Sequence, residues 1–334
     1  MRLAGSFFLL GLTVLTGSIV PAQESTVYTT VVATRLFVVG AANPRTGLHY
    51  QRAAGDTGWH QVGPKTIRAF GMGFFTPSRG RILYIGAGNG VHRSSDFGAT
   101  WKTTTGWRIT EVLGVTPDQH DSNTVYCATE FGVFRSTDGC ATWKEMNTGL
   151  KSTFISCVII DRADPRRLFC ATEEGAYVSE DRGEHWKRMG LSVGGIRTIV
   201  QNPADPLMLI AGTEDFGMYV TRDGGSIWTR TEAGIDHTTF YAIAFNPRNP
   251  DTVYAGGYVT GVYRSLDGAR SWRRVNDGLT ALNIHSIAVD PVHPERIFAA
   301  AYWGGVFRSD TAGEKWTPIG LSESQSWMVC VEPY

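Results

Sequence analysis

The sequence predicts an all-β protein, a single seven-bladed propeller of four-stranded antiparallel blades that is closed by its C-terminal strand. Three observations support this prediction. A tryptophan recurs every 42 to 44 residues, a short polar box precedes it, and short apolar runs separated by turn residues fill each interval. A fixed period of this length is typical of repeats that bury their apolar faces against one another. The recurrent tryptophans are Trp59, Trp101, Trp143, Trp186, Trp228, Trp272 and Trp316.

The polar box has the pattern Ser-x-Asp-x-Gly-x-x-Trp. Some copies match this pattern in full, such as the one from Ser94 to Trp101. Others depart from it, with Cys140 or Ala269 in place of Gly and Thr311 in place of Asp. A short Asp or Ser side chain accepts backbone N–H groups within its own turn, Gly adopts a positive φ, and Trp supplies a large buried area. We therefore expect a structural role, and the ligand-rich spacing of a calcium loop, the alternative, is missing. The box residues are Ser94, Asp96, Gly98, Trp101, Asp138, Trp143, Asp181, Trp186, Asp223, Trp228, Asp267, Trp272 and Trp316.

The strand pattern is clearest in the fourth repeat. Apolar runs at residues 155–160, 168–172 and 175–179 are separated by turn residues, and Trp186 opens a fourth run. Short runs bounded by Gly, Pro and Asp indicate strands joined by hairpins. Residues 23–334, divided by seven, give about 45 residues per repeat, the size of a four-stranded blade.

The two ends of the chain are expected to complete one blade together. Residues 327–333 align with residues 285–291, which start a blade, but no blade follows them. Residues 36–59 resemble the last three strands of a blade. We expect the C-terminal strand to join them, because closure removes the exposed sheet edges that otherwise promote aggregation.

The first 22 residues have the features of a secretory signal peptide. Arg2 precedes an apolar run, and Val20, Pro21 and Ala22 form a small-residue exit, so residues 1–22 are the expected signal and residues 23–334 the propeller. An N-terminal membrane anchor is the alternative. No later apolar run reaches 18 residues, so we expect an exported monomer, secreted or periplasmic, without an integral membrane segment.

The 31 basic residues balance 31 acidic ones, which argues against a nucleic-acid partner.

The boxes resemble the Asp-box, or bacterial neuraminidase (BNR), repeat over nearly the whole of residues 23–334. This family includes sialidases, xyloglucan-cleaving glycoside hydrolases, sortilin-type receptors and photosystem II assembly factors. The resemblance implies that box Asp and Ser cap the hairpin between the third and fourth strands, and that Trp packs between blades. Sialidases of the family use an arginine triad and an Arg-Ile-Pro motif; the nearest string here is Arg81-Ile82-Leu83, and only Arg108 and Arg197 fall on the expected face.

The five cysteines leave two interpretations open. Export permits disulfides, and Cys157 and Cys170 fall on adjacent strands of one repeat, so they form a possible pair. The alternative is that all five are small buried hydrophobic residues. No Cys or His spacing suggests a metal site, and no cofactor is expected.

Aligned repeats place variable residues on one face of the ring. The first position of the loop between strands two and three reads Ala41, Gly88, Glu130, Glu173, Glu214, Tyr258 and Tyr302. The start of strand one reads Gly71, Glu111, Ser156, Arg197, Tyr241, His285 and Trp327. Non-box Trp107 and Trp303 map to the same face, whereas the opposite face is expected to carry only turns. The expected ligand-binding residues are Trp107, Arg197, Tyr241, Tyr258, His285, Tyr302, Trp303 and Trp327.

Two functions follow from this face. Exposed aromatic rings beside carboxylates suit a surface that binds a glycan or a protein partner without catalysis, which is the favoured interpretation. The alternative is a glycoside hydrolase, which needs two carboxylates roughly 5 to 9.5 Å apart. Its candidate residues are Glu130, Glu173, Glu214 and Glu111.

Overall fold

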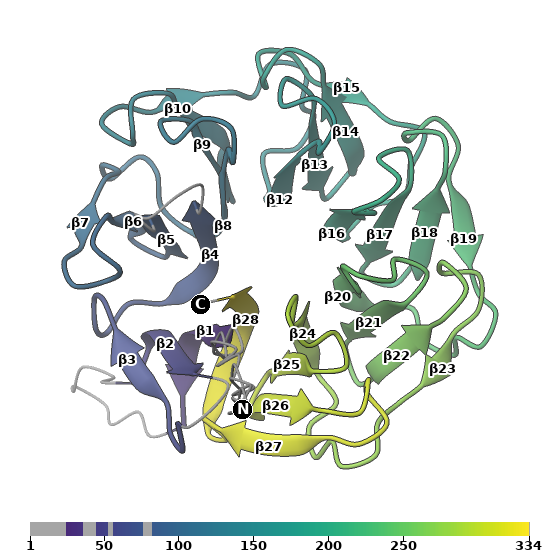
Figure 1. Cartoon of the computed structure of the whole chain (residues 1–334). Coiled ribbons are helices and arrows are strands. Elements are labelled where there is room, and N and C mark those ends of the chain that lie inside the picture. Colours follow the sequence, from purple (N-terminus) through teal and green to yellow (C-terminus); the bar gives the residue numbers. More distant parts are fainter. Residues whose placement is uncertain (1–24, 36–44, 53–55, 76–81, 334) are drawn as a thin grey trace, which may run out of the picture.

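The chain folds into a closed ring of seven blades. The computed structural model describes residues 25–35, 45–52, 56–75 and 82–333. Its strands form seven four-stranded antiparallel sheets arranged in chain order around a central axis (Figure 1). We number the blades from the one that contains both ends of the described chain, so that blade 1 holds β28, β1, β2 and β3. The predicted fold class is confirmed.

Each blade contributes one strand to each of four concentric positions. The innermost strands, in blade order, are β28 (Ser324–Pro333), β4 (Ala69–Phe75), β8 (Val112–Pro117), β12 (Ile155–Ile160), β16 (Ile196–Gln201), β20 (Phe240–Phe245) and β24 (Ile284–Val289). The second strands are β1 (Ser25–Thr34), β5 (Ile82–Ala87), β9 (Val125–Thr129), β13 (Leu168–Thr172), β17 (Leu209–Thr213), β21 (Val253–Gly257) and β25 (Ile297–Ala301).

The two outer positions complete the blades. The third strands are β2 (Gly47–Arg52), β6 (Gly90–Ser94), β10 (Gly132–Ser136), β14 (Gly175–Ser179), β18 (Met218–Thr221), β22 (Gly261–Ser265) and β26 (Gly305–Ser309). The outermost strands are β3 (His60–Val62), β7 (Lys102–Thr103), β11 (Lys144–Glu145), β15 (Lys187–Arg188), β19 (Thr229–Thr231), β23 (Arg273–Arg274) and β27 (Thr317–Gly320).

The core lies between the blades. Every residue of the second strands β9, β13, β17, β21 and β25 is buried, because both faces of these strands pack against a neighbouring blade. The outermost strands are short, and β11, β15 and β23 expose only charged side chains. Short charged edge strands discourage pairing with other chains. Within the described part of the chain, no helix is long and apolar enough to cross a membrane.

Blade 1 closes the ring as predicted, but its N-terminal strands begin earlier than expected. The C-terminal strand β28 pairs with β1, with Val27 opposite Val331. The three N-terminal strands span residues 25–62 and not 36–59, because the Thr- and Val-rich run at residues 25–34 forms β1. Such β-branched runs favour strands, so the sequence carried this signal. The expected signal peptide, residues 1–22, lies outside the described residues.

The polar boxes form the turns between the third and fourth strands. In blade 2, Ser94 Oγ donates to Asp96 Oδ1 (2.8 Å) and accepts the Gly98 N–H (2.8 Å), while Asp96 Oδ1 accepts the Thr100 N–H (2.9 Å). The Thr100 hydroxyl, which donates to Asp96 Oδ2, and the Thr100 N–H are the main causes that lower the pKa of the Asp96 carboxyl to about 2. Cys140 and Ala269 adopt the left-handed φ of the glycine they replace, 72° and 65°. The degenerate boxes therefore keep the same turn.

Several box tryptophans tie one blade to the blade before it. Trp186 Nε1 donates to the Met146 carbonyl (2.7 Å), and Trp316 Nε1 donates to the Val275 carbonyl of blade 6 (2.8 Å). Trp272 Nε1 donates to the Thr231 hydroxyl of blade 5 (3.0 Å). Trp59 Nε1 donates to the Ile319 carbonyl (2.8 Å), which links blade 1 to blade 7. Trp101 and Trp228 instead donate to a glycine carbonyl of their own box, Gly98 and Gly225. The indole bond between blades is thus present in some blades and absent from others.

The Cys157–Cys170 disulfide does not form, and all five cysteines are free. In the β12–β13 ladder Cys170 lies opposite Val158, while Cys157 lies opposite Ala171. The two thiols therefore project from opposite faces of the blade: Cys170 packs in the core between blades 3 and 4, Cys157 in the core between blades 4 and 5. Burial raises the pKa of the Cys157 thiol to about 11. Cys170 is a small buried residue, as the alternative expects, whereas Cys157 is only partly buried.

We expect Trp186→Ala to lower the free energy of unfolding by about 3–5 kcal/mol, because it removes a buried ring and leaves the Met146 carbonyl without its donor. Trp303→Ala serves as the comparison, since this ring is half-buried on a loop and is expected to lose much less. Urea denaturation of both variants measures the difference. Equal losses would contradict the interblade role of Trp186.

We expect Gly149→Ala to destabilise the ring by about 1–3 kcal/mol. Gly149, in the loop between β11 and β12, has a φ of 96°, and an added Cβ would lie 2.2 Å from the Trp186 carbonyl oxygen of the next blade. Gly106→Ala is the matched control, because no atom lies within 4 Å of its added Cβ. Thermal unfolding of the two variants tests this, and similar melting temperatures would overturn the prediction.

Candidate ligand-binding face

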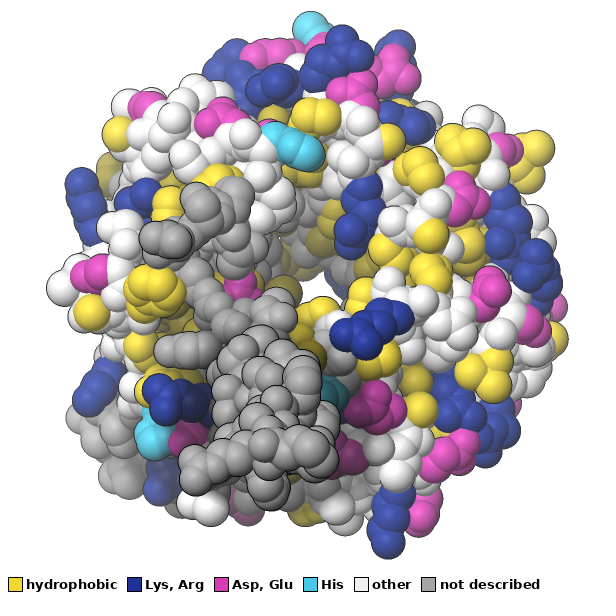
Figure 2. Space-filling view, in the orientation of Figure 1, with side chains coloured by type: hydrophobic (Ala, Val, Ile, Leu, Met, Phe, Trp, Pro, Cys, Tyr) yellow, Lys and Arg dark blue, Asp and Glu magenta, His cyan; other side chains and the backbone are white. Residues whose placement is uncertain are grey.

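A cavity of about 520 Å³ lies at the mouth of the ring where the innermost strands begin. We call it the upper cavity. Figure 2 shows the hollow at the centre of the ring from the opposite side, where the innermost strands end. Residues from all seven blades line the upper cavity: Val32, Arg68, Phe70, Leu113, Glu130, Phe154, Ser156, Arg197, Glu214, Tyr241, His285, Tyr302, Gln325 and Trp327.

A β-bulge at the start of each innermost strand supplies one side chain per blade to this cavity. The ladder between the first two strands skips one residue in every blade, and each skipped residue of the innermost strand lines the upper cavity. A bulge re-aims the side chain of the unpaired residue. We call these the bulge residues: Phe70, Leu113, Ser156, Arg197, Tyr241, His285 and Trp327.

The bulges confirm five positions of the predicted column and correct two. Phe70 and Leu113 take the places assigned to Gly71 and Glu111. A sequence signal for the bulge exists, because in blades 2 to 7 the skipped residue stands between an apolar residue and a small one, as in Ala69-Phe70-Gly71. Alignment on this three-residue pattern would have found both positions. Ala41, in the other predicted column, lies outside the described residues.

Aromatic rings from four blades form a continuous arc along one side of the cavity. His285 lies at the centre, with ring centroids 4.5 Å from Trp327, 4.9 Å from Tyr241 and 5.3 Å from Tyr302. The Phe70 ring meets Trp327 edge-on at 5.6 Å. We call these five residues the aromatic arc. Contacts of this geometry stabilise each ring's orientation, so the arc is a preformed surface.

Charged side chains occupy the opposite side, from blades 3 to 5. Arg197 lies between two loop carboxylates: its Nη1 is 2.6 Å from Glu173 Oε1, and its Nε is 2.8 Å from Glu214 Oε2. Burial opposes the charge of Arg197, but its hydrogen bonds to Glu214 and Glu173 outweigh burial and raise its pKa. Glu130 also lines the cavity, and no described residue forms an ion pair or hydrogen bond with its carboxylate.

Two further polar groups face the cavity without a partner among the described residues. Ser156 Oγ is buried and unbonded. His285 is surrounded by rings, and this burial lowers its pKa to about 4, so the imidazole is uncharged at neutral pH. A neutral imidazole offers one acceptor and one donor. The cavity therefore offers unused hydrogen-bonding capacity to a ligand.

The remaining predicted residues lie around the cavity and do not line it. Trp107 is 83% exposed, and the Arg108 guanidinium stacks on its ring (5.3 Å). Tyr258 is exposed at the tip of the β21–β22 loop. Trp303 meets Tyr302 edge-on at 5.8 Å. Sequence reasoning missed six lining residues that no aligned column singled out: Val32, Arg68, Phe70, Leu113, Phe154 and Gln325.

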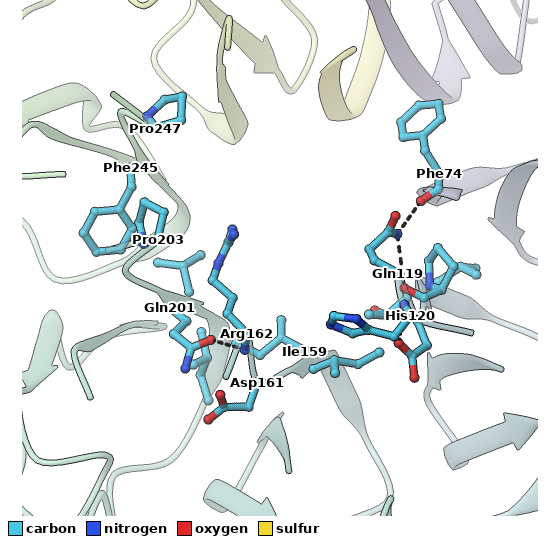
Figure 3. Close-up of a pocket in the computed structure, with 17 residues that line it drawn as sticks. Phe74, Gln119, His120, Ile159, Asp161, Arg162, Gln201, Pro203, Phe245 and Pro247 are labelled. Atoms are coloured by element: carbon cyan, nitrogen blue, oxygen red, sulfur yellow. Dashed lines mark hydrogen bonds between the residues drawn. The ribbon is translucent and has the colours of Figure 1, made fainter. Parts of the chain in front are cut away.

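The expectation that the opposite face carries only turns is wrong. A second cavity of about 680 Å³, the lower cavity, opens where the innermost strands end. His120 and Arg162 point into it from the adjacent blades 3 and 4 (Figure 3). A channel of about 690 Å³ shares lining residues with both cavities. The loops between first and second strands do form turns, but their converging ends also enclose this space.

We expect His285 to make the protein sensitive to mild acid. Unfolding returns the pKa of His285 from about 4 to its ordinary value of about 6.5, so the unfolded state binds more protons between these values. The contribution of His285 to the free energy of unfolding is fully present above pH 6.5. It falls by about 2–3 kcal/mol as the pH drops towards 4. His285→Phe should flatten that part of the profile. Urea titrations from pH 7 to 4.5 measure it.

His120→Gln is the control, because His120 is exposed in the lower cavity. His49 also has a pKa lowered to about 4, mainly by burial, so part of the acid sensitivity will persist in every variant. An unchanged slope in His285→Phe would show that His285 does not contribute.

Comparisons with known proteins show the fold and leave the family open. No family model matches the chain. A curated xyloglucanase from Paenibacillus sp is 36% identical over a stretch that covers 20% of this chain and 9% of that protein. Among solved structures, an ancestral GH74 enzyme has a TM-score of 0.59 at 22% identity and covers 67% of this chain and 33% of its own.

Two further structures resemble the ring. A Niastella koreensis GH74 enzyme has a TM-score of 0.60 at 18% identity, covering 78% of this chain and 45% of its own. A structure of YCF48 bound to D1 peptide has a TM-score of 0.61 at 13% identity, covering 85% of this chain and 88% of its own. The chain thus spans less than half the length of the GH74 enzymes and most of the length of YCF48. All three share the propeller fold with this chain.

Proposed function

We propose that the chain is a non-catalytic binding module whose upper cavity and surrounding loops hold an extended segment of a partner protein. The observation that carries this proposal is the preformed aromatic arc, which faces a set of charged residues across one cavity. Binding sites typically combine an apolar or aromatic wall with a few fixed polar groups. A glycan would use the same wall and is the second ligand class to test.

Exposed apolar residues around the cavity favour a protein over a glycan. Phe131, Phe216, Tyr258 and Val259 are exposed at the tips of loops that join second and third strands. We call these four residues the loop crown. Exposed apolar residues gathered on one face indicate a protein interface.

The loop crown also holds strained backbone. Val259 has a φ of 50°, and its neighbours on the same face, Asp215 and Trp303, have φ values of 72° and 59°. A β-branched residue with positive φ is a rare outlier that costs of order 1–3 kcal/mol. Strained non-glycine residues at loop tips are typical of functional sites, because a glycine there would remove the strain and also the side chain.

The carboxylates of this face are poorly placed for glycoside hydrolysis. Glu173 and Glu214 share one arginine, and Glu111 lies 3.5 Å from Arg68 Nη1. Carboxylates held in ion pairs are not free to protonate a glycosidic oxygen or to activate water. Glu130 remains unpaired among the described residues, but the reaction needs two such groups. The hydrolase alternative is favoured by the GH74 neighbours and by the short stretch similar to a xyloglucanase.

The peptide complex among the structural neighbours supports the binding proposal. YCF48, which has the same fold over most of its length, has been solved with a D1 peptide. At 13% identity this neighbour shows only that a ring of this kind is compatible with peptide binding. We also propose that residues 1–22 are removed on export, so that the partner is met outside the cytoplasm.

We expect the double variant Tyr302→Ala with Trp303→Ala to abolish partner binding while the urea midpoint stays nearly unchanged. A phage-displayed library of random dodecapeptides, selected on the protein from residue 23, supplies the peptide probes, and soluble xyloglucan oligosaccharides supply the glycan probes. Ile227→Ala is the control, because that exposed side chain lies in the turn between β18 and β19, at the opposite end of the blade from the upper cavity.

Three results would overturn the proposal. If the double variant selects the same peptides as the unaltered protein, the site lies elsewhere. If only the oligosaccharides bind, and the double variant loses them, the ligand is a glycan. If the protein cleaves the oligosaccharides and Glu130→Gln or Glu173→Gln abolishes cleavage, the chain is a hydrolase.

A further inference from the structure

We propose that the upper cavity receives a basic side chain, arginine or lysine, of the partner segment, held between the aromatic arc and Glu130. This inference rests on the proposed function and names the chemistry of the group that enters the cavity. It depends on how rings, charges and unused acceptors are distributed around the lining.

The rings and the carboxylates occupy opposite sectors of the same cavity. The aromatic arc comes from blades 1, 2, 6 and 7, whereas the lining carboxylates Glu130 and Glu214 come from blades 3 and 5 (Figure 1). Glu173, which pairs with Arg197 outside the lining, comes from blade 4 between them. A cation between the two sectors would meet ring faces on one side and carboxylate oxygens on the other. Both attract positive charge, the rings through their quadrupole.

Cations already stack on rings around this mouth. Arg68 lies over Phe70 (5.1 Å), Arg197 over Phe154 (5.6 Å), and Arg35 over Trp303 (5.2 Å). No described cation lies over Tyr241, Tyr302 or Trp327. These rings include indole, the best of the three aromatic groups for binding a cation. None of these three rings is therefore already occupied by a described cation.

The arginines of the cavity are already neutralised by carboxylates other than Glu130. Among the lining residues, Glu130 and Glu214 balance Arg68 and Arg197 in number. Outside the lining, Glu111 pairs with Arg68, and Glu173 pairs with Arg197 together with Glu214. His285 is uncharged at neutral pH because burial lowers its pKa. A cationic ligand beside Glu130 would therefore meet a carboxylate without meeting an unpaired positive charge of the lining.

The arginines of the cavity do not occupy the proposed place. Arg197 is held by two carboxylates, through Glu173 Oε1 and Glu214 Oε2. Arg68 pairs with Glu111. Neither forms an ion pair with Glu130, so that carboxylate stays available to an incoming donor.

A buried hydroxyl without a partner points to the same ligand. Ser156 Oγ is inaccessible to water, lines the cavity, and makes no hydrogen bond with any described residue. Because this oxygen is closed off from solvent, a ligand donor reaches it only when neighbouring side chains move, and the donor then satisfies a buried polar group that is otherwise unbonded. A guanidinium carries five N–H donors in a planar fork, which suits several acceptors and a ring face at once.

The test uses short capped peptides, Ac-Gly-Gly-Arg-Gly-Gly-amide and the same peptide with citrulline, a neutral isostere of arginine. Titration calorimetry and ligand-observed NMR, at low salt and at 0.3 M salt, measure the binding of each peptide to a protein that starts at residue 23. We expect the arginine peptide to bind at least tenfold more tightly than the citrulline peptide. Added salt should weaken the binding of the arginine peptide and leave the binding of the citrulline peptide nearly unchanged.

Two variants locate the interaction. Glu130→Gln keeps the shape of the side chain. It is expected to lower the affinity for the arginine peptide at least tenfold and to leave the affinity for the citrulline peptide unchanged. Glu295→Gln, in the loop between β24 and β25 at the far end of the ring, is the matched control and should bind as the unaltered protein does.

The inference and the proposed function fail in different ways. Equal binding of the two peptides, an unchanged Glu130→Gln variant, or no binding of the arginine peptide at millimolar concentration overturns the inference. If binding of the library peptides requires Tyr302 and Trp303 but the selected peptides are not basic, the proposed function stands. Only the inference of a basic side chain in the cavity is then wrong. If library binding is indifferent to Tyr302 and Trp303, the proposed function itself is wrong.

Discussion

Every blade of this protein must bury both of its faces, and the rest of the structure depends on that constraint. A four-stranded sheet with two apolar faces is stable only between two neighbours, so the blades close into a ring that leaves no blade at an end. The fully buried second strands, such as β13 and β17, are the direct result. Indole bonds from Trp186 and Trp272 to the preceding blade, and from Trp59 across the closure, fix the spacing between neighbours.

The bulges make the residues of the binding surface independent of the packing between blades that stabilises the ring. A regular ladder would direct each residue of an innermost strand into one of the two interblade cores, where its size is constrained by packing. Skipping one residue frees a side chain per blade from both cores. The seven bulge residues differ widely in chemistry, from Ser156 to Trp327, while the residues beside them, such as Ile155 and Ile196, remain buried. The ring can therefore vary its ligand without repacking its core.

Charge on the upper face is organised by contacts across blades. Arg197 from blade 5 binds Glu173 from blade 4 and Glu214 from its own blade, so one guanidinium joins two adjacent loops. An ion pair that is partly shielded from water keeps more of its strength than one fully exposed to solvent. This contact orders the acidic side of the cavity, while the contacts of His285 with three rings order the other side.

The features that repeat with each blade could be predicted from the amino-acid sequence alone. The tryptophan period gave the number of blades, the strands at residues 155–160, 168–172 and 175–179 agree with the structure, and Arg197, Tyr241, His285 and Trp327 fell on one face as expected. These are local signals that recur seven times. The tertiary structure decided what depends on strand register and on the convergence of distant segments: Phe70 and Leu113 in place of Gly71 and Glu111, the separation of Cys157 from Cys170, the pairing of Arg197 with two glutamates, and the lower cavity. A slip of one residue changes which face a side chain occupies, and no spacing along a single chain fixes that slip.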